Sequence, residues 1–253
     1  MRKLTLSFLL IAIAVPTMVS AQPQFKALLF TKTAGWHHES INEGVDGIRK
    51  LADRHQFQVD WQEQANRISS ENLKQYDVII FLSTTGDILN EEQQKAMEEF
   101  IQSGKGFVGI HAASDTEYEW EWYTQLVGRM FEIHPANQTT RVTVLDSSFP
   151  GMERMPESYL WTDELYEFGE EKVEGLNYLM TIDESYYEVQ PAWGDKKTEG
   201  MGDFHPVAWY HEFDGGRSFY TAFGHMPQTY SDNMFLEHIY GGIYWAATGK
   251  GIE

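Results

Sequence analysis

The stretch GKGFVGIHAASDTE, residues 104–117, decides the fold that the sequence predicts. Its apolar run FVGI, residues 107–110, predicts a short buried strand, which ends abruptly at His111. Ser114 and Glu117 then form the S-x-x-E pattern that begins a helix. Several α/β enzymes expose a nucleophilic side chain at a strand-to-helix turn of this kind, and this chain presents a histidine there.

Strands and helices alternate on both sides of this stretch. Short apolar runs predict strands in the first half at residues 26–30, 58–61, 77–82 and 106–110. Capping patterns at Ser40–Glu43 and Asn90–Gln93 predict helices between them. The second half predicts a loop-rich region at 146–175, a final helix at 232–247, and strands at 140–145, 178–182, 207–210 and 219–223. This alternation indicates an α/β protein with right-handed crossovers and a mostly parallel sheet.

Residues 1–21 are predicted to be a secretory signal peptide. They combine the basic residues Arg2 and Lys3 with a short apolar run and small residues up to Ala21. The apolar run is interrupted and too short for a transmembrane helix, which needs about 18 or more apolar residues. We expect cleavage after Ala21, a periplasmic or secreted protein with no membrane attachment, and a single domain over residues 22–253.

Composition and missing motifs exclude several classes of function. The formal charge of −19 disfavours binding to nucleic acid or anionic lipid. The absence of cysteine excludes thiol catalysis. No GxGxxG, Walker or GxSxG motif is present, which argues against a dinucleotide cofactor, a P-loop and a serine hydrolase. Aromatic residues make up 14% of the chain, and they either stack on sugar rings or fill the core.

Histidines gather where the predicted elements break. In parallel sheets, sites lie beyond the carboxyl ends of the strands, so residues that follow different strands meet. Histidine suits both proton transfer and divalent metal binding. The spacing matches no local metal motif, so a metal site would combine distant segments, and both roles stay open. Six of the nine histidines lie at such breaks: His37, His38, His111, His134, His205 and His225.

The WTDELY segment, from Trp161 to Tyr166, offers two adjacent acids in a region that is predicted to be turn-like. Asp163 or Glu164 can orient a histidine or act as a general base. The alternative is a helix start, with Thr162 as the cap and the two acids in the first turn.

Six segments in order resemble the trehalose-utilisation (ThuA-like) family, and together they span nearly the whole chain after the signal peptide. The resemblance implies a flavodoxin-like, class I glutamine amidotransferase-like fold, an α/β three-layer sandwich with a mostly parallel sheet. The segments are AGWHHES (34–40), GKGFVGIHAASDTE (104–117), LVGRMFEIHP (126–135), WTDELY (161–166), HPVAWYHEFDGGRSFYTAFGH (205–225) and IYGGIYWAATG (239–249).

The resemblance also implies a location and a substrate class. In class I amidotransferases the turn after the fourth strand carries a nucleophilic cysteine, and a later strand ends in its partner histidine. These positions fall on His111 and near His225, so a cysteine-dependent amidotransferase reaction is excluded. The family is associated with catabolism of trehalose and related disaccharides through 3-keto sugars. For this substrate class we expect a carbohydrate-active lyase, isomerase or hydrolase that uses histidine-assisted proton transfer and elimination, or hydrolysis.

Each candidate residue receives an expected role. The catalytic candidates are His111, His225, Asp163 and Glu164. The candidates for binding the sugar are His37, His134, Trp36, Trp161 and Tyr166. If a zinc-like divalent metal is bound, its expected ligands are His37, His111 and His225. The alternative function is a non-catalytic sugar-binding protein or the partner of a sugar oxidoreductase, which the aromatic content supports.

Overall fold

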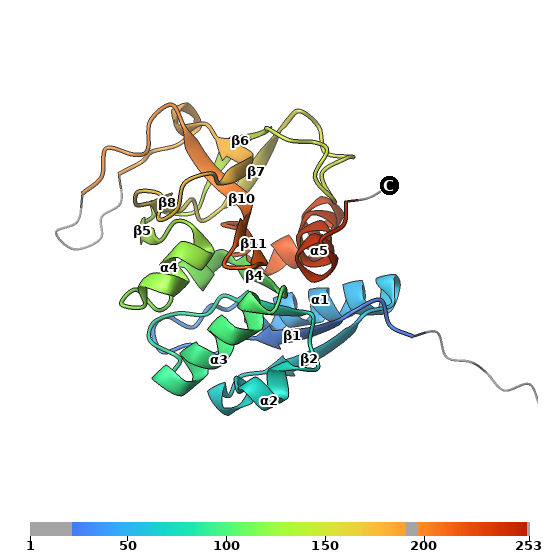
Figure 1. The fold of residues 1–253 in the computed structure, drawn as a ribbon. Coiled ribbons are helices and arrows are strands. Elements are labelled where there is room, and N and C mark those ends of the chain that lie inside the picture. Colours follow the sequence, from blue (N-terminus) through green and yellow to red (C-terminus); the bar gives the residue numbers. More distant parts are fainter. Residues whose placement is uncertain (1–21, 191–196, 252–253) are drawn as a thin grey trace, which may run out of the picture.

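The structure, a computed structural model, describes residues 22–190 and 197–251 (Figure 1). The predicted signal peptide and its cleavage point after Ala21 lie outside these described residues. In the described part of the chain, helices cover both faces of a nine-stranded sheet. None of the described helices is long and apolar enough to cross a membrane.

The elements follow the predicted alternation through the first half of the chain, where the four predicted strands are confirmed to within one residue at each end. The strands are β1 (Lys26–Phe30), β2 (Gln58–Gln62), β3 (Val78–Leu82), β4 (Gly106–Ile110), β5 (Phe131–Ile133), β6 (Gln138–Val144), β7 (Ser158–Asp163), β8 (Glu167–Phe168), β9 (Asn177–Ile182), β10 (His205–Phe213) and β11 (Gly216–Thr221). The α-helices are α1 (Ile41–His55), α2 (Ser70–Leu73), α3 (Glu91–Gln102), α4 (Glu121–Val127) and α5 (Asn233–Thr248). Short 3-10 turns are η1 (Ala65–Arg67), η2 (His111–Ser114), η3 (Glu184–Tyr186) and η4 (Pro227–Ser231).

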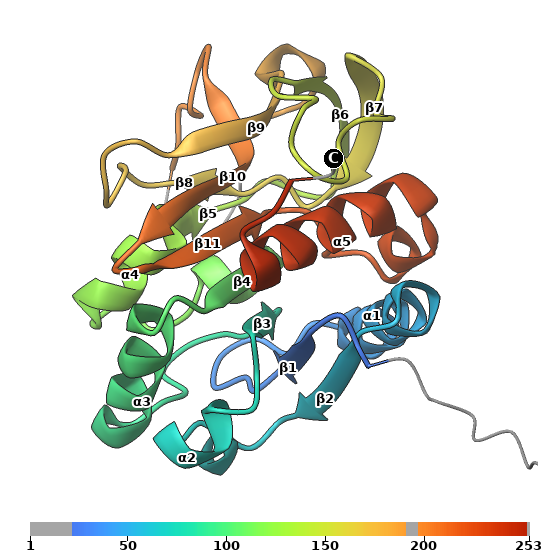
Figure 2. The ribbon, with the colours of Figure 1, turned by 45° about the vertical axis from the view of Figure 1, so that its right-hand side comes forward.

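The large sheet has two halves that differ in strand direction (Figure 2). Strands β2, β1, β3, β4 and β11 lie side by side in parallel, and we call them the parallel half. Strands β10, β9, β6 and β7 extend the sheet from β11 with antiparallel pairing, and they form the antiparallel half. The predicted α/β fold is confirmed, and the second half of the chain adds the antiparallel strands to the parallel sheet.

The molecule is built in three layers. Helices α1 and α5 pack together on one face of the sheet, and α2, α3 and α4 cover the other face (Figures 1 and 2). The central strands β3 and β4 are buried at every position, as expected for parallel strands covered on both sides. A Cβ atom at Gly106 would collide with the Ala246 carbonyl of α5, so this glycine lets the helix approach the strand closely.

The predicted capping patterns differ in outcome. Asn90 and Gln93 form the predicted capping box at the start of α3. Ser40 precedes α1 but makes no side-chain cap. Its hydroxyl instead donates to the carbonyl of Gly224 over 2.9 Å, which ties the start of α1 to the segment after β11. The Ser40 capping prediction is therefore wrong, because a tertiary hydrogen bond takes the hydroxyl.

The capping box predicted at Ser114 and Glu117 is also wrong. Ser114 ends the short turn η2, and its hydroxyl lies 2.8 Å from the Tyr220 hydroxyl. The buried carboxylate of Glu117 accepts the backbone N–H groups of Ile88 and Leu89. Helix α4 begins only at Glu121, because the two side chains satisfy other parts of the fold.

The region expected to be loop-rich contains two strands that the sequence analysis missed, β7 and β8. Strand β7 includes Thr162 and ends at Asp163, so the alternative in which Thr162 caps a helix is wrong. The Thr162 hydroxyl lies 2.7 Å from the Thr139 hydroxyl on the adjacent strand β6. This pairing places Glu164 directly after a strand end.

Candidate active site

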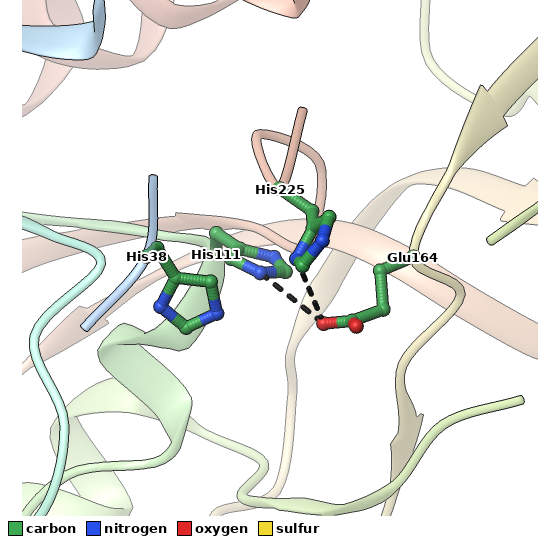
Figure 3. Close-up of side chains that lie close together, drawn as sticks. All are labelled: His38, His111, Glu164 and His225. Atoms are coloured by element: carbon green, nitrogen blue, oxygen red, sulfur yellow. Dashed lines mark ion pairs between the residues drawn. The ribbon is translucent and has the colours of Figure 1, made fainter. Parts of the chain in front are cut away.

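Four side chains from distant parts of the chain meet at the carboxyl ends of the strands (Figure 3). His38 follows β1, His111 follows β4, His225 follows β11 and Glu164 follows β7. One nitrogen or oxygen atom from each of the four lies within 4.8 Å of the others. We call this group the histidine–glutamate cluster. It forms because parallel strands end at one edge of the sheet and because the segment after β7 returns to the end of β11.

His111 enters the cluster through an unusual backbone conformation. Its φ of 53° lies in the left-handed region, which a histidine rarely adopts and which commonly marks functional sites. The ring is completely buried, and Nδ1 lies 2.8 Å from the carbonyl oxygen of Ala222. A carbonyl only accepts hydrogen bonds, so Nδ1 carries the proton. The lone pair is therefore on Nε2, which lies 3.5 Å from Oε2 of Glu164.

The carboxylate of Glu164 lies close to the rings of His111, His225 and His134. Oε2 lies 3.1 Å from Nδ1 of His225, and Oε1 lies 3.2 Å from Nδ1 of His134. Burial alone would raise the pKa of Glu164. The nearby imidazole rings of His111, His225 and His134 outweigh burial and hold the pKa of Glu164 well below its usual range. Glu164 is thus an anion at neutral pH.

Three buried ring nitrogens of the cluster make no hydrogen bond within the described part of the chain: Nδ1 of His38, Nε2 of His111 and Nδ1 of His225. Glu164 lies 3.5 Å from Nε2 of His111 and 3.1 Å from Nδ1 of His225 without a hydrogen bond to either. Buried polar atoms are almost always satisfied, and two of these nitrogens, Nε2 of His111 and Nδ1 of His225, lie beside the Glu164 carboxylate. A proton or a metal ion between such groups would satisfy them.

The charge states of His38 and His225 differ. Burial, together with the charges of His111 and His225, lowers the pKa of His38 to about 2. His38 is therefore neutral at physiological pH, the form in which imidazole binds a metal. Burial also opposes protonation of His225, but the carboxylate of Glu164 outweighs it and raises the pKa of His225.

Asp163 supports the cluster from outside it. Its buried carboxylate accepts four N–H groups: those of Gly224, His225, Glu164 and the Trp161 indole, at 2.9–3.2 Å. Burial raises the pKa of Asp163, and these hydrogen bonds oppose the rise. Asp163 thus joins the loop that carries His225 to the segment that carries Glu164.

The histidine–glutamate cluster faces a cavity of about 880 Å³, which we call the inner cavity. His38, Glu164 and His225 line it together with His134 and Tyr166. The ring of Tyr166 lies against His111, with their centroids 4.4 Å apart. Trp36 stands at the same cavity with 71% of its surface exposed. Five side chains expected at the site, His111, His134, Glu164, Tyr166 and His225, are thus brought together.

Two expected site residues lie elsewhere. His37 is exposed, its Nδ1 lies 3.3 Å from the Thr33 hydroxyl, and the structure places His38 in the cluster instead. Trp161 packs on Phe223 and Phe235 and is not among the residues that line the inner cavity. His38, and not the expected His37, therefore lies in the cluster, because adjacent side chains after a strand point in different directions.

Sequence reasoning also missed Asp115, which lines the inner cavity. The Ser114–Glu117 pattern predicts that Asp115 lies at the start of a helix, whereas it directly follows the turn η2 that carries His111. The signal that identifies Asp115 is its position after β4. Any polar residue just beyond that strand end is a candidate for the cavity wall.

Comparisons with known proteins agree with this fold. The profile of the trehalose utilisation (ThuA) family matches residues 26–246. A protein described as ThuA-like from Bacteroides uniformis has 22% identity and a TM-score of 0.74, covering 94% of this chain and 98% of that one. Another from Parabacteroides merdae has 21% identity and a TM-score of 0.71, covering 91% and 92%.

A more distant likeness is found in a β-galactosidase from Bacillus circulans, with 15% identity, a TM-score of 0.54, and coverage of 89% of this chain and 31% of that one. No curated protein sequence shows significant similarity to this chain. At these identities the solved structures establish the fold alone. The family profile spans nearly all of the described chain and supports a general role in sugar metabolism. The chain therefore belongs to the trehalose utilisation (ThuA) family.

Proposed function

We propose that this protein is a metal-dependent enzyme of disaccharide catabolism that cleaves the glycosidic bond of a disaccharide or its 3-keto derivative. One observation carries the proposal: His38, His111, Glu164 and His225 each place one nitrogen or oxygen atom within 4.8 Å of the others, at the wall of a cavity. Membership of the trehalose utilisation family supports a sugar as the substrate.

The donor set fits a zinc-like divalent ion. Imidazole nitrogen and carboxylate oxygen are the ligands that such ions take from proteins. The second ring nitrogen of His111 donates to a backbone carbonyl, as ligating histidines usually do. Tetrahedral bonds of about 2.1 Å place the ligand atoms about 3.4 Å apart. The four atoms here spread over as much as 4.8 Å, so an ion would draw them inward.

The reaction that suits this site begins with a carbonyl group at C3 of one sugar ring. The carbonyl acidifies the neighbouring C2–H, and a base removes that proton. The electron pair of the C–H bond forms a C1=C2 double bond, the C1–O bond breaks, and the glycosidic oxygen takes up a proton. His38, His111, His225 and Glu164 would hold a divalent ion, which would supply positive charge near the C3 oxygen.

His134 is the side chain best placed to act as the base. Its Nδ1 lies 2.8 Å from the carbonyl oxygen of Pro135 and 3.2 Å from Oε1 of Glu164. Both partners accept hydrogen bonds, so Nδ1 carries the proton and the basic lone pair is on Nε2. The ring also lines the inner cavity, within reach of a bound sugar.

The test is turnover of 3-keto-trehalose by purified protein, assayed with Zn²⁺, Mn²⁺ or Mg²⁺ and after dialysis against a chelator. We expect product only with an added ion, and a loss of at least about 100-fold in kcat for His111→Ala, as for removal of other charge-stabilising groups. The matched control is His37→Ala, whose ring is exposed and outside the cluster. Absence of turnover with every ion would contradict the proposal.

Export is part of the same proposal. The basic start, the apolar run and the small residues before Gln22 support removal of the first 21 residues. Mass spectrometry of the protein from fractionated cells should find an N-terminus at Gln22 in the periplasmic or secreted fraction. A chain that begins at Met1 and stays with the cytoplasmic fraction would rule out export.

A second candidate function is sugar binding without catalysis, alone or as the partner of a sugar oxidoreductase. The exposed ring of Trp36 at the inner cavity favours it, because exposed aromatic faces stack on sugars. Calorimetry separates the two functions. Binding of 3-keto-trehalose that persists in His111→Ala, with no product from the wild type, would favour the binding protein.

A further inference from the structure

A second cavity of about 620 Å³ adjoins the inner cavity, and we call it the outer cavity. The two cavities share the side chains of Asp115 and Phe131. The outer cavity is lined in addition by Tyr118, Glu132 and Thr198, among others. A ligand that occupies both cavities therefore passes Asp115 on its way from one to the other.

Tyr118 gives the outer cavity an aromatic wall that is held in place. Its side chain is 44% exposed, so part of the ring is open to the outer cavity. Its hydroxyl lies 2.7 Å from Oδ1 of Asp115 and 2.8 Å from the carbonyl oxygen of Phe131, which share its single proton. A ring fixed at its hydroxyl loses little further freedom when a ligand stacks on it, which favours binding.

The composition of the outer cavity suits a pyranose ring. Sugars present C–H faces that stack on aromatic rings and hydroxyl groups that pair with charged side chains. The outer cavity offers Tyr118 for the face, and Glu132 and Lys197 for hydroxyl groups. The inner cavity repeats this combination, with Trp36 beside the histidine–glutamate cluster.

Asp115 stands between the two cavities in a fixed backbone position. Its N–H donates to the carbonyl of Ala112 in η2, and its own carbonyl accepts the N–H of Gly86, both over 2.8 Å. These bonds tie it to the segments that follow β3 and β4. The oxygen that bridges two sugar rings would lie at this junction, beside the Asp115 carboxyl group.

We infer that the second ring of the disaccharide binds in the outer cavity, and that Asp115 donates the proton that the bridging oxygen takes up. The inference rests on the proposed function. As the C1–O bond breaks, the departing oxygen accepts the electron pair of that bond and the proton of the Asp115 carboxylic acid. Asp115 is left as a carboxylate, which the Tyr118 hydroxyl stabilises, and solvent returns the proton.

The first experiment compares two leaving groups in the full-length mature protein loaded with the active metal. Asp115→Asn should lower kcat on 3-keto-trehalose by at least about 100-fold, within the range typical of general acid catalysis. On 4-nitrophenyl 3-keto-glucoside it should lower kcat less than about fivefold, because nitrophenolate leaves without a proton. Equal losses on the two substrates would overturn the role of Asp115, and activity on the aryl substrate shows that the variant folds.

The second experiment measures binding without turnover. Calorimetry would measure the affinities for trehalose and for glucose. Tyr118→Ala should lower the affinity for trehalose at least about fivefold and leave the affinity for glucose unchanged, as expected for loss of one stacked ring. The matched control is Tyr186→Ala, which is 49% exposed and lines neither cavity. If Tyr118→Ala leaves trehalose affinity unchanged, the outer cavity does not hold the second ring. Failure of the wild type on both keto substrates would instead overturn the proposed function, and calorimetry would still decide the binding site.

Discussion

The parallel half and the antiparallel half of the sheet supply different chemistry to one site. His38, His111 and His225 follow strands of the parallel half, whereas Glu164 follows β7 at the edge of the antiparallel half. The three histidines of the cluster thus come from one half of the sheet and the carboxylate comes from the other. The parallel half positions its side chains through the shared edge at which its strands end. The antiparallel half is instead held against that edge by side-chain contacts such as those of Asp163.

The largest expected effect comes from removing the charge that the antiparallel half contributes. Glu164→Gln keeps the shape of the side chain and removes its charge, so we expect kcat on 3-keto-trehalose to fall about 10²–10³-fold. Steady-state kinetics with saturating metal checks this. If the variant retains more than a third of the activity, the parallel half alone carries the chemistry.

The next effect tests the tie between the halves. Asp163→Asn presents an amide to four N–H donors, so at least one hydrogen bond to a charged acceptor is lost. We expect a loss of about 2–3 kcal/mol in the free energy of unfolding, measured with urea. Metal affinity should also fall about 10–100-fold, as when a supporting group of a metal ligand is removed. Unchanged metal affinity would show that Asp163 stabilises the fold without positioning His225.

A smaller effect concerns how stability depends on pH. It involves His238, a buried histidine of α5 that is not part of the cluster. Burial lowers the pKa of His238 to about 3. Between about pH 6.5 and pH 3, the unfolded chain binds a proton at this histidine that the folded chain does not bind. The free energy of unfolding therefore decreases as the pH is lowered through this range. His238→Leu should remove about 1.4 kcal/mol per pH unit from that slope. Urea unfolding at pH 7, 6 and 5 measures it, and an unaltered slope would contradict the assignment.

The smallest effect distinguishes two polar residues of the parallel half, one that stabilises only the fold and one that also supports the site. Asn90→Ala removes the capping box of α3 and should cost about 1 kcal/mol of stability while leaving kcat unchanged. Ser40→Ala instead breaks the bond to Gly224 beside His225, so it should reduce metal affinity at a similar cost in stability. Thermal unfolding and metal titration of both variants check this difference. Equal metal affinities in the two variants would contradict it.

The two halves also differ in how far the sequence predicts them. Strands β1, β3 and β4 are continuous apolar runs between clear turn signals, so local patterns suffice to find them. Strand β7 alternates exposed and partly buried residues at a sheet edge, and its sequence contains no long apolar run. Its position depends on pairing with β6, which no local pattern shows.

The same limit applies to the site. The strand-end rule locates His111 and His225 because it needs only the order of elements. It does not decide between His37 and His38, since the direction of a side chain in a loop depends on tertiary packing. The Ser40 and Ser114 patterns mimic helix caps, yet both hydroxyls bond to distant residues, Gly224 and Tyr220. Short polar motifs near a site are therefore weaker predictors than apolar runs.

The central claim is that the histidine–glutamate cluster binds a divalent ion, and direct metal binding tests it without any assumption about substrate. The chelator-treated protein would be titrated with Zn²⁺ in a calorimeter, and the bound metal would be counted by elemental analysis. We predict one equivalent for the wild type and for His37→Ala, and an affinity lowered at least about 100-fold for His38→Ala and Glu164→Gln, since each lacks one of four ligands. Equal affinity in His37→Ala and His38→Ala, or no uptake by the wild type, would contradict the claim.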